Sequence, residues 1–139
     1  MAERTGQFHT VFKFRDALGT TQTAILWARK SFLDKNAEVV KDFMEDYVRS
    51  WRYLNDAQNR DELLKIIANH MKGTPQQFAW INTKDDEYRD PWAVPDLEIM
   101  QRNIDDLARE KFLPGTVKVA ENSDLSFIKE ARRRIESGK

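Results

Sequence analysis

Helical periodicity is the sequence feature that most limits what this chain can fold into, because it governs nearly every residue after Asn36. Apolar residues recur there at intervals of three and four, which places them on one face of an α-helix. Asn36 is expected to cap a first long helix, with apolar positions from Val39 to Leu54. A second helix is expected to begin at Asn59 and to end at Gly73, because a glycine suits the positive φ that follows a last turn.

Three further helices are expected in the second half of the chain. Thr74 is expected to cap a short one, because a proline follows it at the first helical position. A strongly amphipathic helix is expected to begin at Pro95 and to be terminated by Pro114–Gly115. Its buried face is predicted to consist of Leu97, Met100, Ile104, Leu107, Ala108 and Phe112. The last helix is expected to follow Asp124, which can cap it. Its inward-facing residues are predicted to be Leu125, Ile128, Ala131 and Ile135.

Two segments before Asn36 are expected to be strands. Residues 8–14 alternate with the period of a half-buried strand, and residues 23–29 form a short apolar run typical of a buried one. Trp27 in that run and Trp51 in the first long helix are predicted to lie in the core. The expected fold class is therefore α/β, mostly helical with a small N-terminal strand element. A two-stranded unit is marginal alone and has open edges, which favours either a piece of a larger fold or a chain that pairs with another copy of itself.

Composition indicates a globular chain and excludes several kinds of site. With 139 residues, the whole of residues 1–139 is expected to form a single domain. Lys plus Arg and Asp plus Glu number 23 each, so the net charge gives no reason to bind nucleic acid or an anionic membrane. The absence of cysteine excludes disulfides and thiolate sites. No stretch approaches the roughly 18 apolar residues of a membrane span. The first ten residues lack the apolar core of a secretion signal, which favours a cytoplasmic location for the chain as written.

Most of the chain carries a recognisable order of motifs. Residues 16–56 contain an apolar run, the motif ARKSF, a polar cap and a long helix with spaced aromatics. Residues 88–119 run from YRDPWAVPDLEIMQRN to FLPGTVKV, and residues 124–131 read DLSFIKEA. This order resembles the later part of solute-binding proteins of the nitrate/sulfonate/taurine group of ABC importers. That group includes binders of aliphatic sulfonates, nitrate, bicarbonate and pyrimidine precursors of thiamine.

The resemblance implies a fold and a function. The implied fold is part of one lobe of a type II periplasmic-binding-protein fold. The implied function is capture of a small anionic or heterocyclic solute between two lobes, followed by delivery to an ABC permease without an enzymatic step. Family members work in the periplasm and are longer, and the early strands that build most of their cleft have no counterpart here. The chain is therefore expected to be an incomplete lobe, and a homo-oligomer could supply missing surface.

Five residues are predicted to contact the ligand. Thr20, Thr21 and Gln22 correspond to the family's crossover segment, and their hydroxyls and amide could donate to an oxyanion. Ordinary turn residues would have the same composition. Tyr88 and Trp92 lie in the irregular loop of residues 82–95, where they could form an aromatic surface for a ligand or partner. They could equally cap the core.

Other polar clusters give no chemical site, and no metal or cofactor is predicted. The acidic loop of residues 85–90 lacks the ligand spacing of a calcium loop and is expected to be solvated. His9 and His70 have no nucleophile motif around them, although a catalytic triad is recognised in space and not in sequence. The basic residues Arg132–Arg134 are expected to favour the negative end of the last helix and not nucleic acid. The chain is not expected to be an enzyme.

Two function classes remain open from the sequence. The first is a solute-binding component of an ABC importer for small anions, or its truncated remnant. The second is a repurposed helical module for dimerisation or protein interaction with no transport role. The order of motifs favours the first, and the missing cleft strands favour the second.

Overall fold

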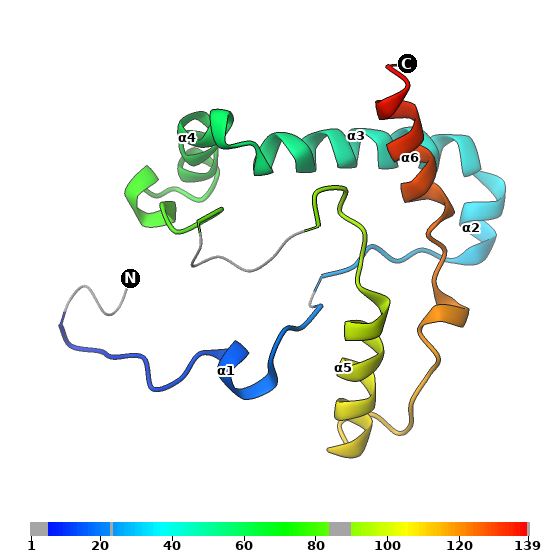
Figure 1. The fold of residues 1–139 in the computed structure, drawn as a ribbon, viewed down its shortest axis with the longest axis horizontal. Coiled ribbons are helices and arrows are strands. Elements are labelled where there is room, and N and C mark those ends of the chain that lie inside the picture. The colour runs from blue at the N-terminus through cyan, green and yellow to red at the C-terminus, as the bar shows by residue number, and fades with distance from the viewer. Residues whose placement is uncertain (1–5, 23, 84–89, 139) are drawn as a thin grey trace. The chain divides into compact units, whose positions relative to one another are not determined.

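The computed structural model describes residues 6–22, 24–83 and 90–138, and over those residues the chain is helical without a strand (Figure 1). The helices are α1 (Phe14–Leu18), α2 (Lys30–Lys35), α3 (Ala37–Asn55), α4 (Arg60–His70), α5 (Leu97–Arg109) and α6 (Ser126–Glu136). Short 3₁₀ turns cover Ala57–Asn59, Pro75–Phe78 and Ala120–Asn122. The predicted helices are confirmed at α3, α4, α5 and α6, but two predicted caps are wrong. Asn36 precedes α3 without a side-chain cap hydrogen bond, and α6 follows Leu125 and not Asp124.

The predicted α/β lobe is wrong, because neither expected strand forms in the described part of the chain. Phe8 and Phe12 are 61% and 66% exposed, and the chain turns into α1 at Phe14. In the second segment Trp27, predicted to lie in the core, is 84% exposed. A strand is stabilised by the backbone of a neighbouring strand and by packing across it. Alternation along the sequence cannot provide that neighbour, and the described residues offer none.

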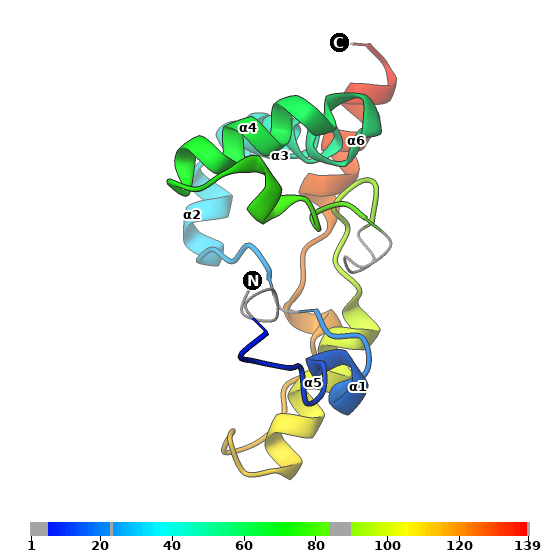
Figure 2. The ribbon, with the colours of Figure 1, turned by 90° about the vertical axis from the view of Figure 1, so that its left-hand side faces the viewer.

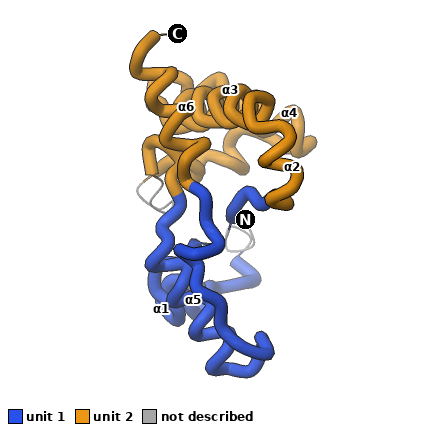
Figure 3. The backbone as a smooth tube through the Cα atoms, turned by 90° about the vertical axis from the view of Figure 1, so that its right-hand side faces the viewer, with its two compact units in different colours: residues 1–27, 95–124 blue, residues 28–94, 125–139 orange. Residues whose placement is uncertain are grey.

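The chain divides into two compact units, which Figure 3 colours separately. Unit 1 consists of residues 1–27 and 95–124, and unit 2 of residues 28–94 and 125–139. The expected single domain of residues 1–139 stays a prediction. Each unit joins segments that are distant in sequence, so neither is a local structure.

The core of unit 2 lies where α6 crosses α3 (Figures 1 and 2). Val48, Ile128 and Ala131 are at most 5% exposed, and they belong to the stripes predicted to face inward. Around them pack Met44, Tyr47, Trp92, Ala93, Val94, Leu125 and Ile135. Trp51, also predicted in the core, is half-buried. Helices α2 and α4 lie at opposite ends of α3.

The turn after α4 corrects the role predicted for Gly73. Lys72 adopts the left-handed conformation with φ of 53°, and the Gly73 N–H donates to the Ala68 carbonyl at 2.8 Å. A β-carbon on Gly73 would meet the Gln77 side chain and lie 2.9 Å from the Phe78 ring. The glycine is therefore required for this close approach and not for its φ. The capping pair predicted here forms, because the Thr74 N–H donates to the Gln77 side chain at 2.8 Å.

Unit 1 is organised by α5. The Asp96 side chain caps the helix by accepting the Ile99 N–H at 2.9 Å. The helix ends at Arg109, earlier than the predicted Pro114–Gly115, because Lys111 takes φ of 63° and reverses the chain. The local turn thus ends the helix before the proline can act.

The apolar face of α5 is only partly covered. The helix contains no buried residue, Leu107 is 44% exposed, and Phe112 beyond its end is 78% exposed. Among the described side chains of unit 1, the buried apolar one is Val119, at 4% exposure, whose N–H donates to the Gln101 side chain at 2.8 Å. The predicted buried face is therefore half-buried at best.

Candidate functional site

Trp92 lies against two arginines in unit 2. The guanidinium carbon of Arg52, on α3, is 4.4 Å from the centroid of the Trp92 ring, and that of Arg132, on α6, is 4.9 Å from it. Both distances are within cation–π range. The indole itself packs against the core formed by α3 and α6. We call Arg52, Trp92 and Arg132 the arginine–tryptophan cluster.

Asp90 sets the conformation of the loop that carries Trp92. One oxygen of its carboxylate accepts the N–H groups of Trp92 at 2.8 Å and of Val94 at 3.0 Å. Its backbone carbonyl accepts the indole N–H of Trp51 at 2.7 Å. Between these contacts Ala93 adopts φ of 58°, a conformation that costs a residue with a β-carbon about 1 kcal/mol. The carboxylate thus offsets a strained turn and fixes the backbone on both sides of Ala93.

The two arginines of the cluster differ in their charge partners. Arg52 has no carboxylate within ion-pair distance among the residues that the structure describes. Arg132 pairs with Glu136 at 2.8 Å, and both side chains are about half-exposed. Exposed pairs of this kind contribute roughly 0–1 kcal/mol, so this one can be exchanged for another anion.

The other two residues of the Arg132–Arg134 segment are held by carboxylates. Arg133 pairs with Glu130 at 2.6 Å, and Arg134 pairs with Asp42 of α3 at 2.7 Å. The hydrogen bonds from Arg133, and then from Arg134, lower the pKa of Glu130 to about 2. The Arg134–Asp42 pair connects α6 to α3, and the two pairs together neutralise most of the basic segment.

The predicted Thr20–Gln22 segment lies in unit 1, where its polar groups contact α5. The Arg102 guanidinium donates to the Thr20 carbonyl. The Gln22 amide donates to the Ala24 carbonyl at 2.8 Å and accepts the N–H of Asp96 at 3.3 Å. Thr21 is half-buried. The Gln22 side chain is therefore engaged with its own unit, and ligand contact by Thr20, Thr21 and Gln22 stays a prediction.

Tyr88, like most of the acidic loop of residues 85–90, lies outside the described residues. His9 and His70 are both exposed, one in each unit. Within residues 6–22, 24–83 and 90–138, no group of His, Asp and Glu side chains could hold a metal ion. None of the helices in those ranges combines the length and apolarity that crossing a membrane requires.

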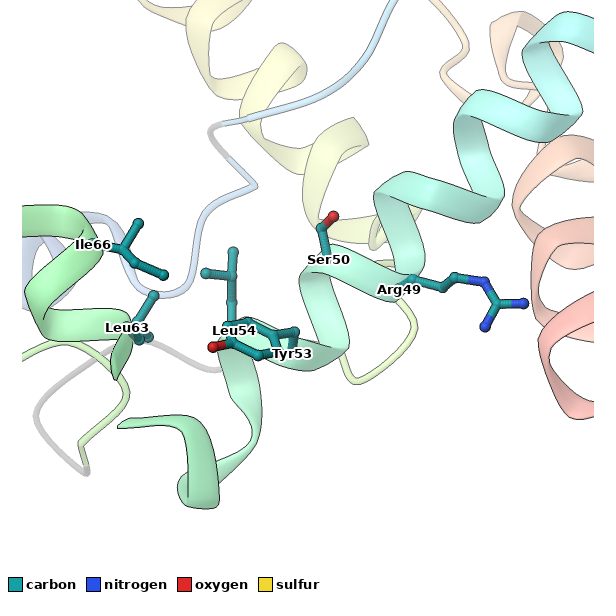
Figure 4. A pocket seen from close by; sticks show the side chains of 6 residues that line it. All are labelled: Arg49, Ser50, Tyr53, Leu54, Leu63 and Ile66. Carbon is teal, nitrogen blue, oxygen red and sulfur yellow. The ribbon is translucent and has the colours of Figure 1, made fainter. Parts of the chain in front are cut away.

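An open apolar pocket of about 420 Å³ lies between α3 and α4 (Figure 4). Its lining is Arg49, Ser50, Tyr53, Leu54, Leu63 and Ile66. Leu54, Leu63 and Ile66 gather at one side, while the Arg49 side chain extends away from them. The Tyr53 hydroxyl donates to Glu62 at 2.7 Å, which raises the pKa of Tyr53. The pocket thus has an apolar floor and a polar rim.

Comparison of the chain with models of protein families, with curated proteins and with solved structures finds no match. The resemblance to solute-binding proteins therefore depends on the sequence motifs alone and stays a prediction.

The sequence predicted Trp92 as a contact residue, but it did not single out Arg52 and it assigned Arg132 to the negative end of the last helix. Arg52 and Arg132 are 80 residues apart in numbering, and each is one of many charged residues on an amphipathic helix. The only available signal was that both helices were expected to pack inward. Their convergence on one ring depends on the crossing of α3 and α6.

Proposed function

We propose that the chain is a solute-binding protein for a small anion, the function that its resemblance implies, and that the arginine–tryptophan cluster contacts the ligand. The observation that carries this proposal is the Arg52 guanidinium, held 4.4 Å from the Trp92 ring with no carboxylate partner among the described residues. A guanidinium can bind an oxyanion through two parallel hydrogen bonds.

Arg132 and Trp92 complete the proposed contact. Arg132 lies 4.9 Å from the same ring and can exchange its exposed partner Glu136 for a ligand oxygen. The indole lies against both cations, which reduces the conformational entropy that each loses when an anion binds. Binding of this kind requires no nucleophile and no proton transfer, so the proposed role is not enzymatic. Delivery of the solute to an ABC permease belongs to the same proposal.

Thermal unfolding of the whole chain tests the proposal. The panel consists of nitrate, sulfate, taurine, alkylsulfonates, bicarbonate and pyrimidines. A ligand that binds only the native state adds about 2.7 kcal/mol of stability at a concentration of 100 Kd. For a chain of this length we expect the midpoint to rise by several degrees.

Two variants and one control separate specific binding from salt effects. Sulfate stabilises most proteins by exclusion from their surface, so only a shift that depends on the cluster counts. Arg52→Gln and Arg132→Gln should abolish the shift caused by the bound anion. Arg109→Gln, an exposed arginine of unit 1, should leave it intact. A panel without any cluster-dependent shift would remove the support for anion binding.

A second candidate function is the protein-interaction module, and a different observation favours it. Large apolar side chains of unit 2 are exposed, among them Phe43 at 54% and Val39 at 66% on α3. Exposed apolar side chains that form a contiguous patch mark interaction sites. Sedimentation velocity of the chain from micromolar to near-millimolar concentration tests the homotypic form of this function.

A further inference from the structure

One face of α3 points away from the α6 packing and carries two exposed large apolar side chains, Val39 and Phe43. Val39, Phe43, Asp46 and Ser50 follow one another at intervals of four, three and four, which places them in a single stripe along the helix. Val48, the most buried residue of α3, contacts the α6 core on a different side. We call these four residues, together with the pocket between α3 and α4, the outer α3 surface.

The pocket continues the stripe at the C-terminal end of α3. Ser50 belongs both to the stripe and to the pocket lining, so the two are contiguous. From Val39 to Leu54 the surface extends about 22 Å, using 1.5 Å of rise per residue. That length accommodates roughly four turns of a second helix. Ile66 of α4, at 52% exposure, borders the groove from the other side (Figure 4).

The charge of this surface indicates which partner fits. The outer α3 surface contains two charged residues, Asp46 and Arg49. Arg49 is paired with Glu45 at 2.6 Å, whereas Asp46 has no ion pair among the described residues. Next to it, the carboxylates of Glu38 and Asp42 are 75% and 72% exposed although each is in contact with a cation. A second copy of α3 centred on this stripe would bring Asp46 close to its own counterpart, which is unfavourable. A partner with a cation opposite Asp46 would instead be stabilised.

We propose that the outer α3 surface binds a basic amphipathic helix of a partner protein. Large apolar side chains of that helix would cover Val39 and Phe43 and fill the pocket, and a lysine or arginine would pair with Asp46. Helix-in-groove binding of this kind uses apolar anchors three and four residues apart. The inference rests on the interaction-module function and names its partner.

Fluorescence anisotropy with two labelled peptides tests the inference on the full chain. One probe is an amphipathic 15-residue peptide of leucine and lysine, and the other has the same leucine pattern with glutamate in place of lysine. We expect the lysine peptide to bind at least tenfold more tightly than the glutamate peptide. Phe43→Ser should weaken its binding at least tenfold, and Ile66→Ser, in the pocket, should also weaken it.

Matched controls distinguish binding at this surface from non-specific hydrophobic binding elsewhere on the chain. Phe112→Ser removes a phenylalanine of unit 1 that is even more exposed, and should change the Kd less than twofold. Asp46→Asn should weaken binding several-fold at low salt, with the difference shrinking in 0.5 M salt because the charges are exposed. Circular dichroism of each variant establishes that it is folded.

Three outcomes would overturn the inference. Equal binding of the two peptides would remove the role of charge, and equal effects of Phe43→Ser and Phe112→Ser would remove the role of this surface. Self-association that Phe43→Ser abolishes, without peptide binding, would make a second copy the occupant and leave the interaction-module function standing. Absence of both self-association and peptide binding would remove that function as well.

Discussion

Truncation of Val48 should destabilise unit 2, while the same truncation at Val39 should not. Both valines lie on α3, but Val48 is 0% exposed and Val39 is 66% exposed. Val48 contacts the core shared with Ile128 and Ala131 of α6. The comparison keeps the chemical change and the helix constant and varies only burial.

The magnitude follows from the burial of two methyl groups. Each buried carbon is worth about 0.8 kcal/mol, and the cavity left behind adds to that loss. Alanine recovers up to about 0.6 kcal/mol through its higher helix propensity. The expected loss for Val48→Ala is therefore about 2 kcal/mol. For Val39→Ala the gain in helix propensity remains, and little apolar surface is lost from the core. The free energy of unfolding is therefore expected to rise by between zero and about 0.5 kcal/mol.

Urea unfolding followed by circular dichroism at the helix band measures both variants. We expect a lower midpoint for Val48→Ala with an unchanged m-value, since the surface exposed on unfolding is nearly the same. In a thermal scan the loss corresponds to several degrees. If the two variants lost equal stability, or if Val39→Ala lost more, the assignment of the core to the α3–α6 crossing would be wrong.

Three further outcomes are expected from the polar contacts. Asp90→Ala should cost about 1–2 kcal/mol in urea unfolding because two backbone N–H groups lose their acceptor, whereas Asp90→Asn, which keeps an acceptor oxygen, should cost less. Asp96→Ala should cost about 1 kcal/mol by removing the cap of α5, measured in the same assay against Glu98→Ala, a control that leaves the cap in place. Hydrogen bonds from Arg133 and Arg134 lower the pKa of Glu130 to about 2, so its contribution to stability is complete above pH 4.5 and is lost as the pH falls towards 2. In Glu130→Gln the urea midpoint should therefore depend less on pH across that window, and an unchanged dependence would contradict the assignment.

Helix positions were predictable because they depend on local patterns. The apolar spacing from Val39 to Leu54 favours a helix whatever its tertiary surroundings, and α3 spans these residues. Thr74 begins its helical segment as predicted, whereas α5 begins after its cap Asp96 and not at the predicted Pro95. At the end of α4, however, the conformation differs from the prediction. Lys72 and not Gly73 takes the positive φ, and Gly73 is needed for its close approach to Phe78.

Strands were not predictable in the same way, because a strand exists only with a partner. Residues 8–14 and 23–29 have the composition of strands, but composition does not provide a neighbouring strand with which to form hydrogen bonds. The described residues of both segments have no such neighbour, and Trp27 is exposed as a result.

The sequence by itself determined helices α3 to α6 and the apolar stripes of α3 and α6, since each depends on residues within a few turns of one another. Only the tertiary structure decided that Arg52 and Arg132 meet at Trp92, and that Val39 and Phe43 are left uncovered while Val48 is buried. The physical reason is that the crossing of two helices selects which part of each apolar stripe is covered. That selection depends on packing between residues far apart in the chain, which no local pattern encodes.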